Sequence, residues 1–366
     1  QTLKSSFLMV QSKYTYLLGW LNFILVCTSC SDNSPSISVV CEENSVGNCI
    51  IKWETAPVME GKVKIYSSTN PDSIAENLPI AMADISAQRI TIVTDNPKKR
   101  YYYMMVFNDR YRVKVATRNI NVPGIQNFRD LGGYKVAQGK SVRWGMIYRS
   151  AEIDSLEKCS CKELQNIGVK TIIDLRTAQE KGGSCSLKNN FNVINIPIAT
   201  GNMEGVLKAL QKNEIKTDTI YRMVEQMNRD LIIKNRVEFK LLFHALLNKE
   251  NYPVVIHCSS GKGRTGISVA LILTALGVNS DDIMQDYRLS NVYFNIPKAT
   301  RYAYKLPVQS QEAITTLFSA QEGFLNAAFN EIERNYGDAK TYLKQGVGLS
   351  KEDMQQLKSI LLEPGN

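Results

Sequence analysis

The chain has 366 residues, of which 44% are hydrophobic and 22% are charged, a composition that excludes a disordered or fibrous protein. One hydrophobic core rarely extends over so many residues, so the length favours two domains. The formal net charge of +9 at pH 7 is spread along the chain without basic runs, which argues against nucleic-acid binding.

Residues 1–30 are typical of an export signal. The apolar run from Leu17 to Val26 is ten residues long, whereas a membrane-spanning helix needs about 20, so we expect a cleaved signal. The segment VCTSCSDN resembles a bacterial lipobox, in which a cysteine becomes lipid-modified and holds the protein to a membrane, and Cys30 is the candidate anchor. A plain secretory signal is the alternative. Both predict an exported protein: an outer-membrane lipoprotein, or a periplasmic or cell-surface protein.

Residues 31–121 are predicted to form an all-β sandwich, because short extended runs recur between turn residues. Trp53 and the later tyrosines 101–103 make this segment resemble a fibronectin type III or immunoglobulin-like domain. Cys41 and Cys49 flank a turn-rich stretch and could pair in an oxidising compartment, but their spacing leaves the pairing open. The extended runs are SISVVC, CIIKWE, KVKIYSS, RITIVT, RYYYMMVF and YRVKVAT.

Residues 122–366 show strands alternating with helices, which predicts an α/β domain with a central, mostly parallel sheet flanked by helices. Apolar residues at helical spacing fill 218–248, and the helix at 267–276 is expected to end at Gly277. Ser350 and Asp353 predict the start of a C-terminal helix. The strand-like runs are VRWGMIYRS, GVKTIIDLR, NVINIPI and YPVVIHC.

The loop HCSSGKGRTG, residues 257–266, follows the last of these strands and precedes a helix. Gly261 and Gly263 allow a backbone that points N–H groups inward, and a helix N-terminus behind them favours a bound anion. A cysteine in this field has its pKa lowered from about 8.5 toward 3.5–7.5, so Cys258 should be a thiolate. Arg264 can hold two oxygens of a tetrahedral anion with its planar fork. The loop therefore predicts an enzyme that attacks phosphorus through sulfur.

The same loop resembles the signature of the cysteine-dependent tyrosine phosphatase superfamily, His-Cys-five residues-Arg-Thr/Ser-Gly. Other segments resemble the bacterial tyrosine and lipid phosphatases of that superfamily, and the similarity covers about residues 122–362. These segments are NFRDLGGY, IYRSAEI, GVKTIIDLRTAQE, DYRLSN and NYGDAKTYL.

The resemblance implies a role for each position of the loop. Cys258 would be the nucleophile, Arg264 would hold the transferring group, and His257 would orient the loop. Thr265 could donate its hydroxyl to the sulfur or to the departing phosphate. The phosphate-binding backbone amides would come from Ser259, Ser260, Gly261, Lys262 and Gly263.

The sequence offers several candidates for the general acid that protonates the leaving group. Many relatives have an aspartate where this chain has Gly263, and that position cannot donate a proton here. Asp174 is the first candidate because it ends a neighbouring strand at the same sheet edge, although it could instead hold an arginine or a loop. Glu204 and Asp218 are the alternatives.

We therefore expect phosphomonoester hydrolysis through a cysteinyl phosphate, most readily on phosphotyrosine in proteins. Phosphoinositides or inositol phosphates are an alternative, because Lys262 adds a cation beside the loop. A phosphate-binding pseudophosphatase is the third hypothesis; the glycine at 263 favours it, and the retention of Cys258 and Arg264 opposes it. With only two histidines in the chain, we expect no metal site and no cofactor.

Overall fold

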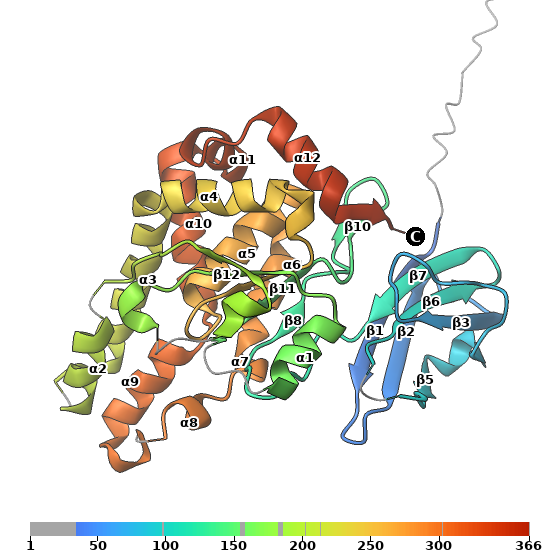
Figure 1. The fold of residues 1–366 in the computed structure, drawn as a ribbon, viewed down its shortest axis with the longest axis horizontal. Helices are drawn as coiled ribbons and strands as arrows, with labels where there is room; N and C mark the ends of the chain where they lie inside the picture. The colour runs from blue at the N-terminus through green and yellow to red at the C-terminus, as the bar shows by residue number, and fades with distance from the viewer. Residues whose placement is uncertain are drawn as a thin grey trace, which may run out of the picture.

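The computed structural model describes residues 34–96, 99–153, 158–181, 186–201, 203–212, 214–301 and 303–365. Figure 1 shows a β-rich N-terminal part beside a larger part in which helices surround a sheet. The predicted export signal and its candidate anchor, Cys30, lie outside the described residues. Within the described ranges, no helix has the length and apolar character needed to cross a membrane.

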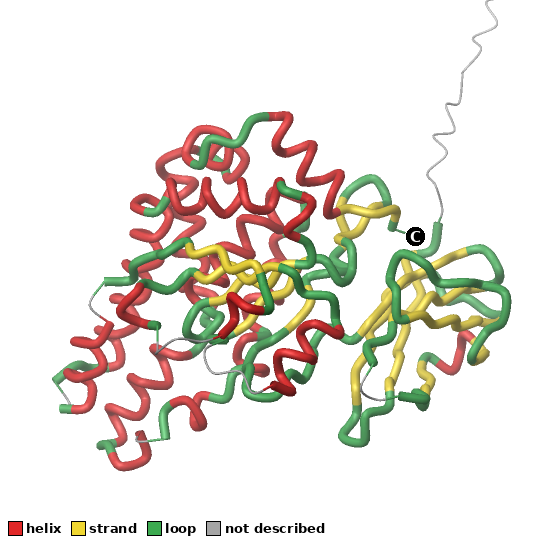
Figure 2. Tube along the Cα trace, in the orientation of Figure 1, coloured by secondary structure: helices red, strands yellow, loops and turns green. Residues whose placement is uncertain are grey.

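The N-terminal part contains two antiparallel sheets, with strand orders β1-β2-β5 and β4-β3-β6-β7 (Figure 2). All six extended runs predicted from the sequence form strands. The additional strand, β4, was missed because it has only four residues, pairs along one side only with β3, and lacks a run of β-branched residues. The strands are β1 (Ser36–Glu43), β2 (Cys49–Ala56), β3 (Lys62–Ser68), β4 (Ala81–Asp84), β5 (Arg89–Ile92), β6 (Tyr102–Phe107) and β7 (Tyr111–Ala116).

One hydrophobic core lies between these two sheets. Trp53 of β2 packs edge-on against Phe107 of β6, with ring centroids 6.3 Å apart, and its indole N–H donates to the carbonyl of Ile85 at 2.7 Å. The polar end of the buried indole is therefore satisfied. Cys41 and Cys49 form a disulfide bond between β1 and β2, which settles the pairing that the sequence left open.

The C-terminal part is built on a mixed five-stranded sheet with the order β13-β12-β14-β11-β8. Strands β11, β14, β12 and β13 run parallel to one another, and β8 pairs with β11 in the antiparallel direction. The strands of this part are β8 (Arg129–Asp130), β9 (Lys135–Val136), β10 (Lys140–Val142), β11 (Ile147–Ser150), β12 (Thr171–Asp174), β13 (Asn192–Asn195), β14 (Val254–His257) and β15 (Leu362–Pro364).

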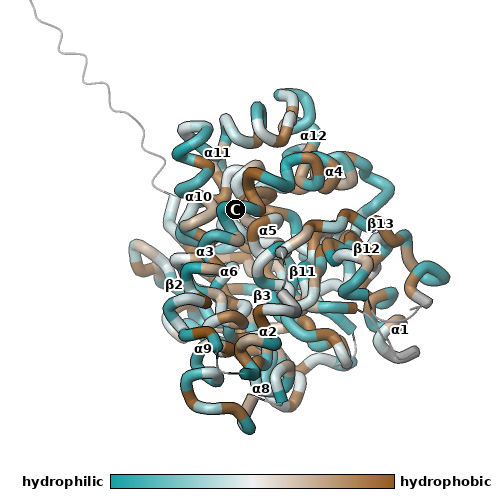
Figure 3. The backbone as a smooth tube through the Cα atoms, turned by 90° about the vertical axis from the view of Figure 1, so that its left-hand side faces the viewer, coloured by the Kyte–Doolittle hydropathy of each residue, from teal (hydrophilic) through white to brown (hydrophobic). Residues whose placement is uncertain are grey.

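Each face of this sheet is covered by its own hydrophobic cluster. Ile172 and Val255 pack with α1 on one face, and Ile173 and Ile256 pack into the larger cluster of the other helices. Hydrophobic and hydrophilic residues alternate along covering helices such as α4, as Figure 3 shows. The helices are α1 (Lys158–Asn166), α2 (Met203–Gln211), α3 (Thr217–Lys234), α4 (Arg236–Leu247), α5 (Gly263–Leu276), α6 (Ser280–Arg288), α7 (Ser290–Tyr293), α8 (Ile296–Ala299), α9 (Val308–Phe318), α10 (Glu322–Tyr336), α11 (Ala339–Thr341) and α12 (Lys351–Leu361).

The helix boundaries predicted from the sequence are confirmed at two places. Helix α5 ends at Gly277, which has a φ of +95°, a left-handed conformation that suits glycine. Helix α12 begins after Ser350, whose side chain and that of Asp353 cap each other's backbone N–H groups. The helical stretch at 218–248 is two helices, because the chain leaves helical geometry at Asn235.

The two parts meet at a buried arginine. Arg100, just before β6, forms an ion pair of 2.7 Å with Asp130 of β8 and donates to the hydroxyl of Tyr148 of β11 at 2.9 Å. The side chain of Arg100 is 7% exposed and that of Asp130 is 0% exposed. The carboxylate also accepts backbone N–H groups from Gly132 and Gly145. The N-terminal part is thus fixed to the sheet that carries the loop 257–266.

Replacing Arg100 with methionine should lower the free energy of unfolding by about 3–5 kcal/mol, because the carboxylate of Asp130 would stay buried without its cation. Urea denaturation measures this change. Arg112→Met is the control, because its ion pair with Glu76 is partly exposed and should contribute about 1 kcal/mol or less. Equal effects of the two substitutions would show that the buried pair does not hold the two parts together.

Candidate active site

The loop 257–266 lies at the centre of one edge of the mixed sheet. Strand β14 lies between β12 and β11, and its last residue, His257, is in register with Asp174 and with Ser150. Parallel strands bring their carboxyl ends to the same edge, where ligands bind in α/β proteins. Helix α5 begins at Gly263, one residue before Arg264, so the guanidinium belongs to the first turn of the helix.

The loop is held with its carbonyl groups turned outward. Arg149 donates to the carbonyl of Gly261 at 2.7 Å, and the amide of Asn127 donates to the carbonyls of Ser260 and Gly261 at 3.2 Å. The carbonyl of Ser259 accepts the backbone N–H of Glu152 at 3.1 Å. The N–H of a trans peptide points opposite to its C=O, so the N–H groups that follow these carbonyls face the inside of the loop. This arrangement is the one that the predicted anion cradle requires.

The two loop glycines have different functions. Gly261 has a φ of +69°, and a Cβ there would collide with the backbone of Ser150, so the close approach of the loop to β11 requires glycine. Gly263 has no positive φ, and a Cβ there would meet no atom within 4 Å. Gly263 is the first residue of helix α5 and needs no left-handed conformation, so the inward direction of its N–H group stays a prediction.

Asp286 of α6 supports the loop from behind. Its carboxylate pairs with Arg149 and, at 3.1 Å, with Arg129, and all three side chains are at most 1% exposed. Burial raises the pKa of Asp286, but the two guanidinium groups outweigh it and hold that pKa well below its usual value. Because Arg149 also donates to the loop, this charged cluster fixes the position of the cradle.

Cys258 lies at the bottom of the loop and is 2% exposed. Burial raises the pKa of its thiol, but the charge of Arg264, the hydroxyl and backbone N–H of Thr265 and the backbone N–H of Gly261 outweigh burial. The net effect is a lowered pKa, which favours the nucleophilic thiolate. The buried hydroxyl of Thr265 has no other hydrogen-bond partner among the described residues, so its donation to the sulfur or to the departing phosphate stays a prediction.

Arg264 is held by a carboxylate that the sequence analysis did not identify. Its two terminal nitrogens pair with the two oxygens of Glu180 at 2.5 Å and 2.7 Å. Burial raises the pKa of Glu180, but the hydrogen bonds from Arg264 outweigh it and lower that pKa to about 2. A guanidinium has five N–H donors, and the described contacts of Arg264 use only its terminal nitrogens, so the Nε–H remains for a phosphoryl oxygen. Glu180 thus positions Arg264.

The sequence did contain a signal for Glu180. Thr177 and Glu180 form a capping box around a single 3₁₀ turn directly after β12, and Glu180 accepts a hydrogen bond from the backbone N–H of Thr177 at 2.9 Å. A Thr-x-x-Glu pattern at the end of a central strand places a carboxylate at the ligand-binding edge. The side chain also accepts the hydroxyl of Ser259 at 3.0 Å.

Replacing Glu180 with glutamine should lower kcat/KM by about 10²-fold, because a catalytic group displaced by about 1 Å loses that much. The effect should fall on kcat more than on KM, since Arg264 would remain charged but less well oriented. The loss should be the same from pH 5 to pH 8, because Glu180 is ionised throughout this range and its pairing weakens only as the pH falls toward about 2. Glu322→Gln, which alters an exposed pair with Arg288, is the control. An unchanged kcat would mean that Arg264 is positioned without Glu180.

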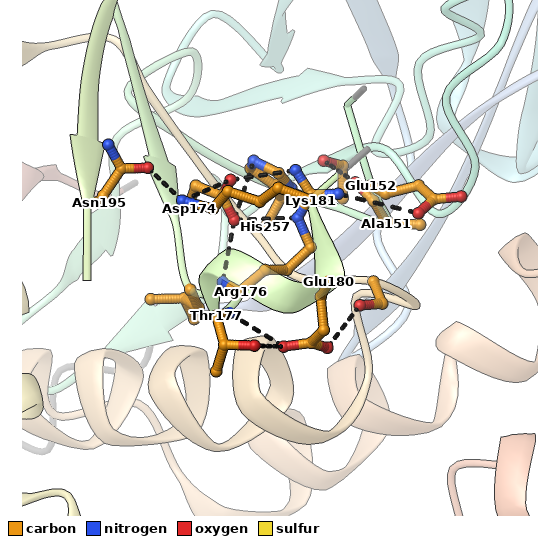
Figure 4. Close-up of polar contacts among 12 residues, drawn as sticks. Ala151, Glu152, Asp174, Arg176, Thr177, Glu180, Lys181, Asn195 and His257 are labelled. Atoms are coloured by element: carbon orange, nitrogen blue, oxygen red, sulfur yellow. Dashed lines mark hydrogen bonds and ion pairs between the residues drawn. The ribbon is translucent and has the colours of Figure 1, made fainter. Parts of the chain in front are cut away.

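Asp174, the first candidate for the general acid, has a different role in the structure. Its carboxylate accepts from the side chain of Arg176 at 3.0 Å and 3.1 Å and lies 3.5 Å from the ammonium of Lys181, as Figure 4 shows. Burial raises its pKa, but the hydrogen bonds from Arg176 and the charge of His257 outweigh burial and lower it. Because Arg176 and Lys181 lie against its carboxylate and Asp174 does not line the cavity that contains Cys258, Asp174 is not placed to protonate a leaving group.

Neither of the other two candidates for the general acid is placed at the loop by the described residues. Asp218 is exposed in the first turn of α3 and does not line the cavity that contains Cys258. The side chain of Glu204 lies outside the described residues. His257 is fully buried with its Nε2 3.7 Å from Asp174, which agrees with a role in orienting the loop.

A cavity of about 1070 Å³ opens above the loop. The loop forms part of its lining together with Glu152 and Glu180. Apolar side chains also line the cavity, and Lys298 and Arg301 add positive charge. Apolar wall residues include Leu207, Val224, Met227, Phe294, Leu317, Phe318 and Phe324. Among the described residues, no group of three or more His, Cys, Asp or Glu side chains could hold a metal ion.

Comparison with known proteins assigns the family. A family model described as "Tyrosine phosphatase family" matches residues 120–363, more than half of the chain. A protein of Cupriavidus necator with a provisional tyrosine-protein phosphatase name is 29% identical over 243 residues, covering 65% of this chain and 86% of that protein. The triple specificity protein phosphatase PtpB of Mycobacterium tuberculosis is 25% identical over 275 residues, covering 66% of this chain and 98% of that protein.

Similarity to solved structures is weaker. The core catalytic domain of the PP-IP phosphatase SIW14 from S. cerevisiae has a TM-score of 0.26 and 18% identity, covering 48% of this chain and 99% of that chain. A score this low adds nothing to the assignment, which depends on the family model and on the loop that holds Cys258 and Arg264. The chain belongs to the tyrosine phosphatase family.

Proposed function

We propose that this protein hydrolyses phosphoric monoesters, with Cys258 as the nucleophile and phosphotyrosine in proteins as the main substrate. The main observation behind the proposal is that three features occur together in the lining of one cavity. These are a thiol with a lowered pKa, a guanidinium held by Glu180, and a loop whose N–H groups face inward. Each favours negative charge on a transferring phosphoryl group.

The reaction has two steps. In the first, the thiolate of Cys258 forms a bond to phosphorus as the bond from phosphorus to the leaving oxygen breaks, and that oxygen takes up a proton. In the second, water attacks the cysteinyl phosphate, phosphate leaves, and the thiolate is restored. Arg264 and the inward-facing N–H groups hold the phosphoryl oxygens in both steps. The described residues supply these groups without a cofactor.

Phosphotyrosine fits the shape and chemistry of the cavity. A tyrosine ring that carries its phosphate to the loop would lie against apolar residues such as Phe294 and Phe318. Related proteins bear names of this specificity, including a tyrosine-protein phosphatase of Nostoc commune that is 26% identical over 226 residues. Phosphoinositides or inositol phosphates are the second candidate, and the cations Lys262, Lys298 and Arg301 around the cavity favour them.

The test compares a phosphotyrosine peptide, a phosphoinositide in phosphatidylcholine vesicles and a soluble inositol phosphate, each in the presence of EDTA. The proposal expects the highest kcat/KM on the peptide. A higher kcat/KM on either inositol compound would show that the main substrate is an inositol phosphate or phosphoinositide. The proposed reaction through Cys258 would still hold. Binding of all three compounds without phosphate release would instead support a pseudophosphatase and contradict the proposed reaction.

We also propose that the protein is exported and attached to a membrane through a lipid on Cys30, with a fibronectin type III or immunoglobulin-like domain in the segment 31–121. The strand orders β1-β2-β5 and β4-β3-β6-β7 support the domain assignment, and the Cys41–Cys49 disulfide supports an oxidising compartment. Metabolic labelling with a fatty acid tests the anchor. Label that persists in Cys30→Ser would exclude this cysteine as the attachment site.

A further inference from the structure

The ammonium group of Lys262 lies inside the protein and belongs to the loop that carries the nucleophile. Lys262 lines the cavity and is 4% exposed. Its Nζ lies 5.7 Å from the ring centre of Phe294 and 5.3 Å from that of Phe318, and no described residue hydrogen-bonds to it. A buried ammonium with spare N–H donors, on the floor of a substrate cavity, requires a partner from a bound molecule.

The cavity offers no other well-placed acid among the described residues. Position 263 has no side chain. Glu180 is an ionised partner of Arg264, and protonating it would release the guanidinium that holds the phosphoryl group. The side chain of Glu152 is 58% exposed, and its carboxylate lies 3.9 Å from the guanidinium of Arg176. Expulsion of a tyrosine or alcohol oxygen nevertheless requires a proton.

We propose that Lys262 donates this proton to the leaving oxygen and so takes the place of the carboxylic acid that position 263 lacks. The inference rests on the proposed function, because it assigns one step of that reaction. As the bond between phosphorus and the leaving oxygen breaks, the oxygen takes a proton from Nζ, and the N–H electron pair stays on nitrogen. In the second step the neutral amine takes a proton from the attacking water, which restores the ammonium and releases the thiolate.

The electrostatic surroundings of Lys262 suit this cycle. Burial lowers the pKa of Lys262 to about 7, while the charge of Cys258 opposes the shift. A phosphoryl dianion in the loop would favour the protonated form in the same way. The other charged or titratable groups lining the cavity are Glu152, Glu180, Arg264, Tyr287, Lys298 and Arg301.

The test measures kcat/KM for a good leaving group, 2,4-dinitrophenol, and a poor one, phenol, each as its phosphate ester. Lys262→Arg keeps the cation but does not release a proton near neutral pH. This variant should lose about 10²–10⁴-fold on phenyl phosphate and much less on 2,4-dinitrophenyl phosphate, because the second leaving group needs no proton. Lys262→Met removes the cation and should lose at least as much on phenyl phosphate.

The pH profile provides a second readout. Only the protonated amine can donate, so kcat/KM of the wild type on phenyl phosphate should fall as the pH rises above about 7. This basic limb should be absent in Lys262→Arg. If Lys262→Arg instead lowers kcat/KM by the same factor for both esters, Lys262 is only a phosphate ligand and the inference fails. If the loss specific to phenyl phosphate appears in Glu152→Gln and not in Lys262→Arg, the acid is Glu152.

A gain of function completes the design. A side chain at position 263 would meet no atom within 4 Å at its Cβ, so Gly263→Asp fits the fold. Added to Lys262→Arg, it should restore phenyl phosphate turnover by at least about tenfold, because a carboxylic acid would again stand in the loop. If Gly263→Asp does not raise phenyl phosphate turnover in the Lys262→Arg background, the loss in Lys262→Arg is not due to a missing proton donor, and the inference fails. Absence of turnover of both esters by the wild type would refute the proposed function itself.

Discussion

Replacing Cys258 with serine is expected to lower kcat on the order of 10⁶-fold while leaving substrate binding nearly intact. A serine hydroxyl fits the space of the buried thiol, but it stays protonated at neutral pH, so the nucleophile is lost and the cradle remains. Removing the nucleophilic serine of the protease subtilisin lowers its kcat by about the same factor. Steady-state kinetics on the phosphotyrosine peptide and equilibrium binding of the same peptide measure the two quantities.

Cys161→Ser is the matched control for this substitution. Cys161 lies in α1, does not line the cavity, and is not disulfide-bonded. Iodoacetate should inactivate the wild type at neutral pH, because the thiolate form of Cys258 is favoured by its lowered pKa, and bound phosphate should protect the enzyme. Turnover that survives in Cys258→Ser would exclude the cysteinyl phosphate.

Replacing Arg264 with lysine is expected to lower kcat/KM by about 10³–10⁵-fold, the range found for arginines that stabilise phosphoryl transfer. A lysine keeps the positive charge but cannot hold Glu180 with two parallel hydrogen bonds and still offer a fixed donor to phosphate. Affinity for inorganic vanadate, which adopts the geometry of the transferring group, should fall with kcat/KM.

Arg288→Lys provides the control for Arg264→Lys, because Arg288 forms an exposed pair with Glu322 at 2.7 Å. It should change neither kcat/KM nor vanadate affinity. If Arg264→Lys lowered kcat/KM less than tenfold, the planar guanidinium would not be needed for catalysis. The positive charge alone would then explain the role of position 264.

Sequence reasoning found the reacting groups because they are close together in the chain. Cys258, Arg264 and Thr265 occupy a single loop between a strand and a helix, so their spacing fixes their approximate positions without knowledge of the rest of the fold. Strand and helix patterns were equally local, which is why the predicted strands and the ends of α5 and α12 agree with the structure.

The tertiary structure alone decided which charges meet. Asp174 was a plausible acid until the structure showed Arg176 against its carboxylate. Glu180, 84 residues before Arg264, was not selected at all. Several carboxylates share the same sheet edge, and their order in the sequence does not say which one points toward a given guanidinium.

The sequence by itself thus predicted the reaction type, the nucleophile and the arginine, since the five consecutive residues between Cys258 and Arg264 specify the loop. Only the tertiary structure determined the partner of Arg264, the burial of Lys262 beside Phe294 and Phe318, and the attachment of the N-terminal part through Arg100. The physical reason is that the pKa values and pairing of these groups depend on desolvation and on neighbours from distant elements, which exist only once the chain has folded.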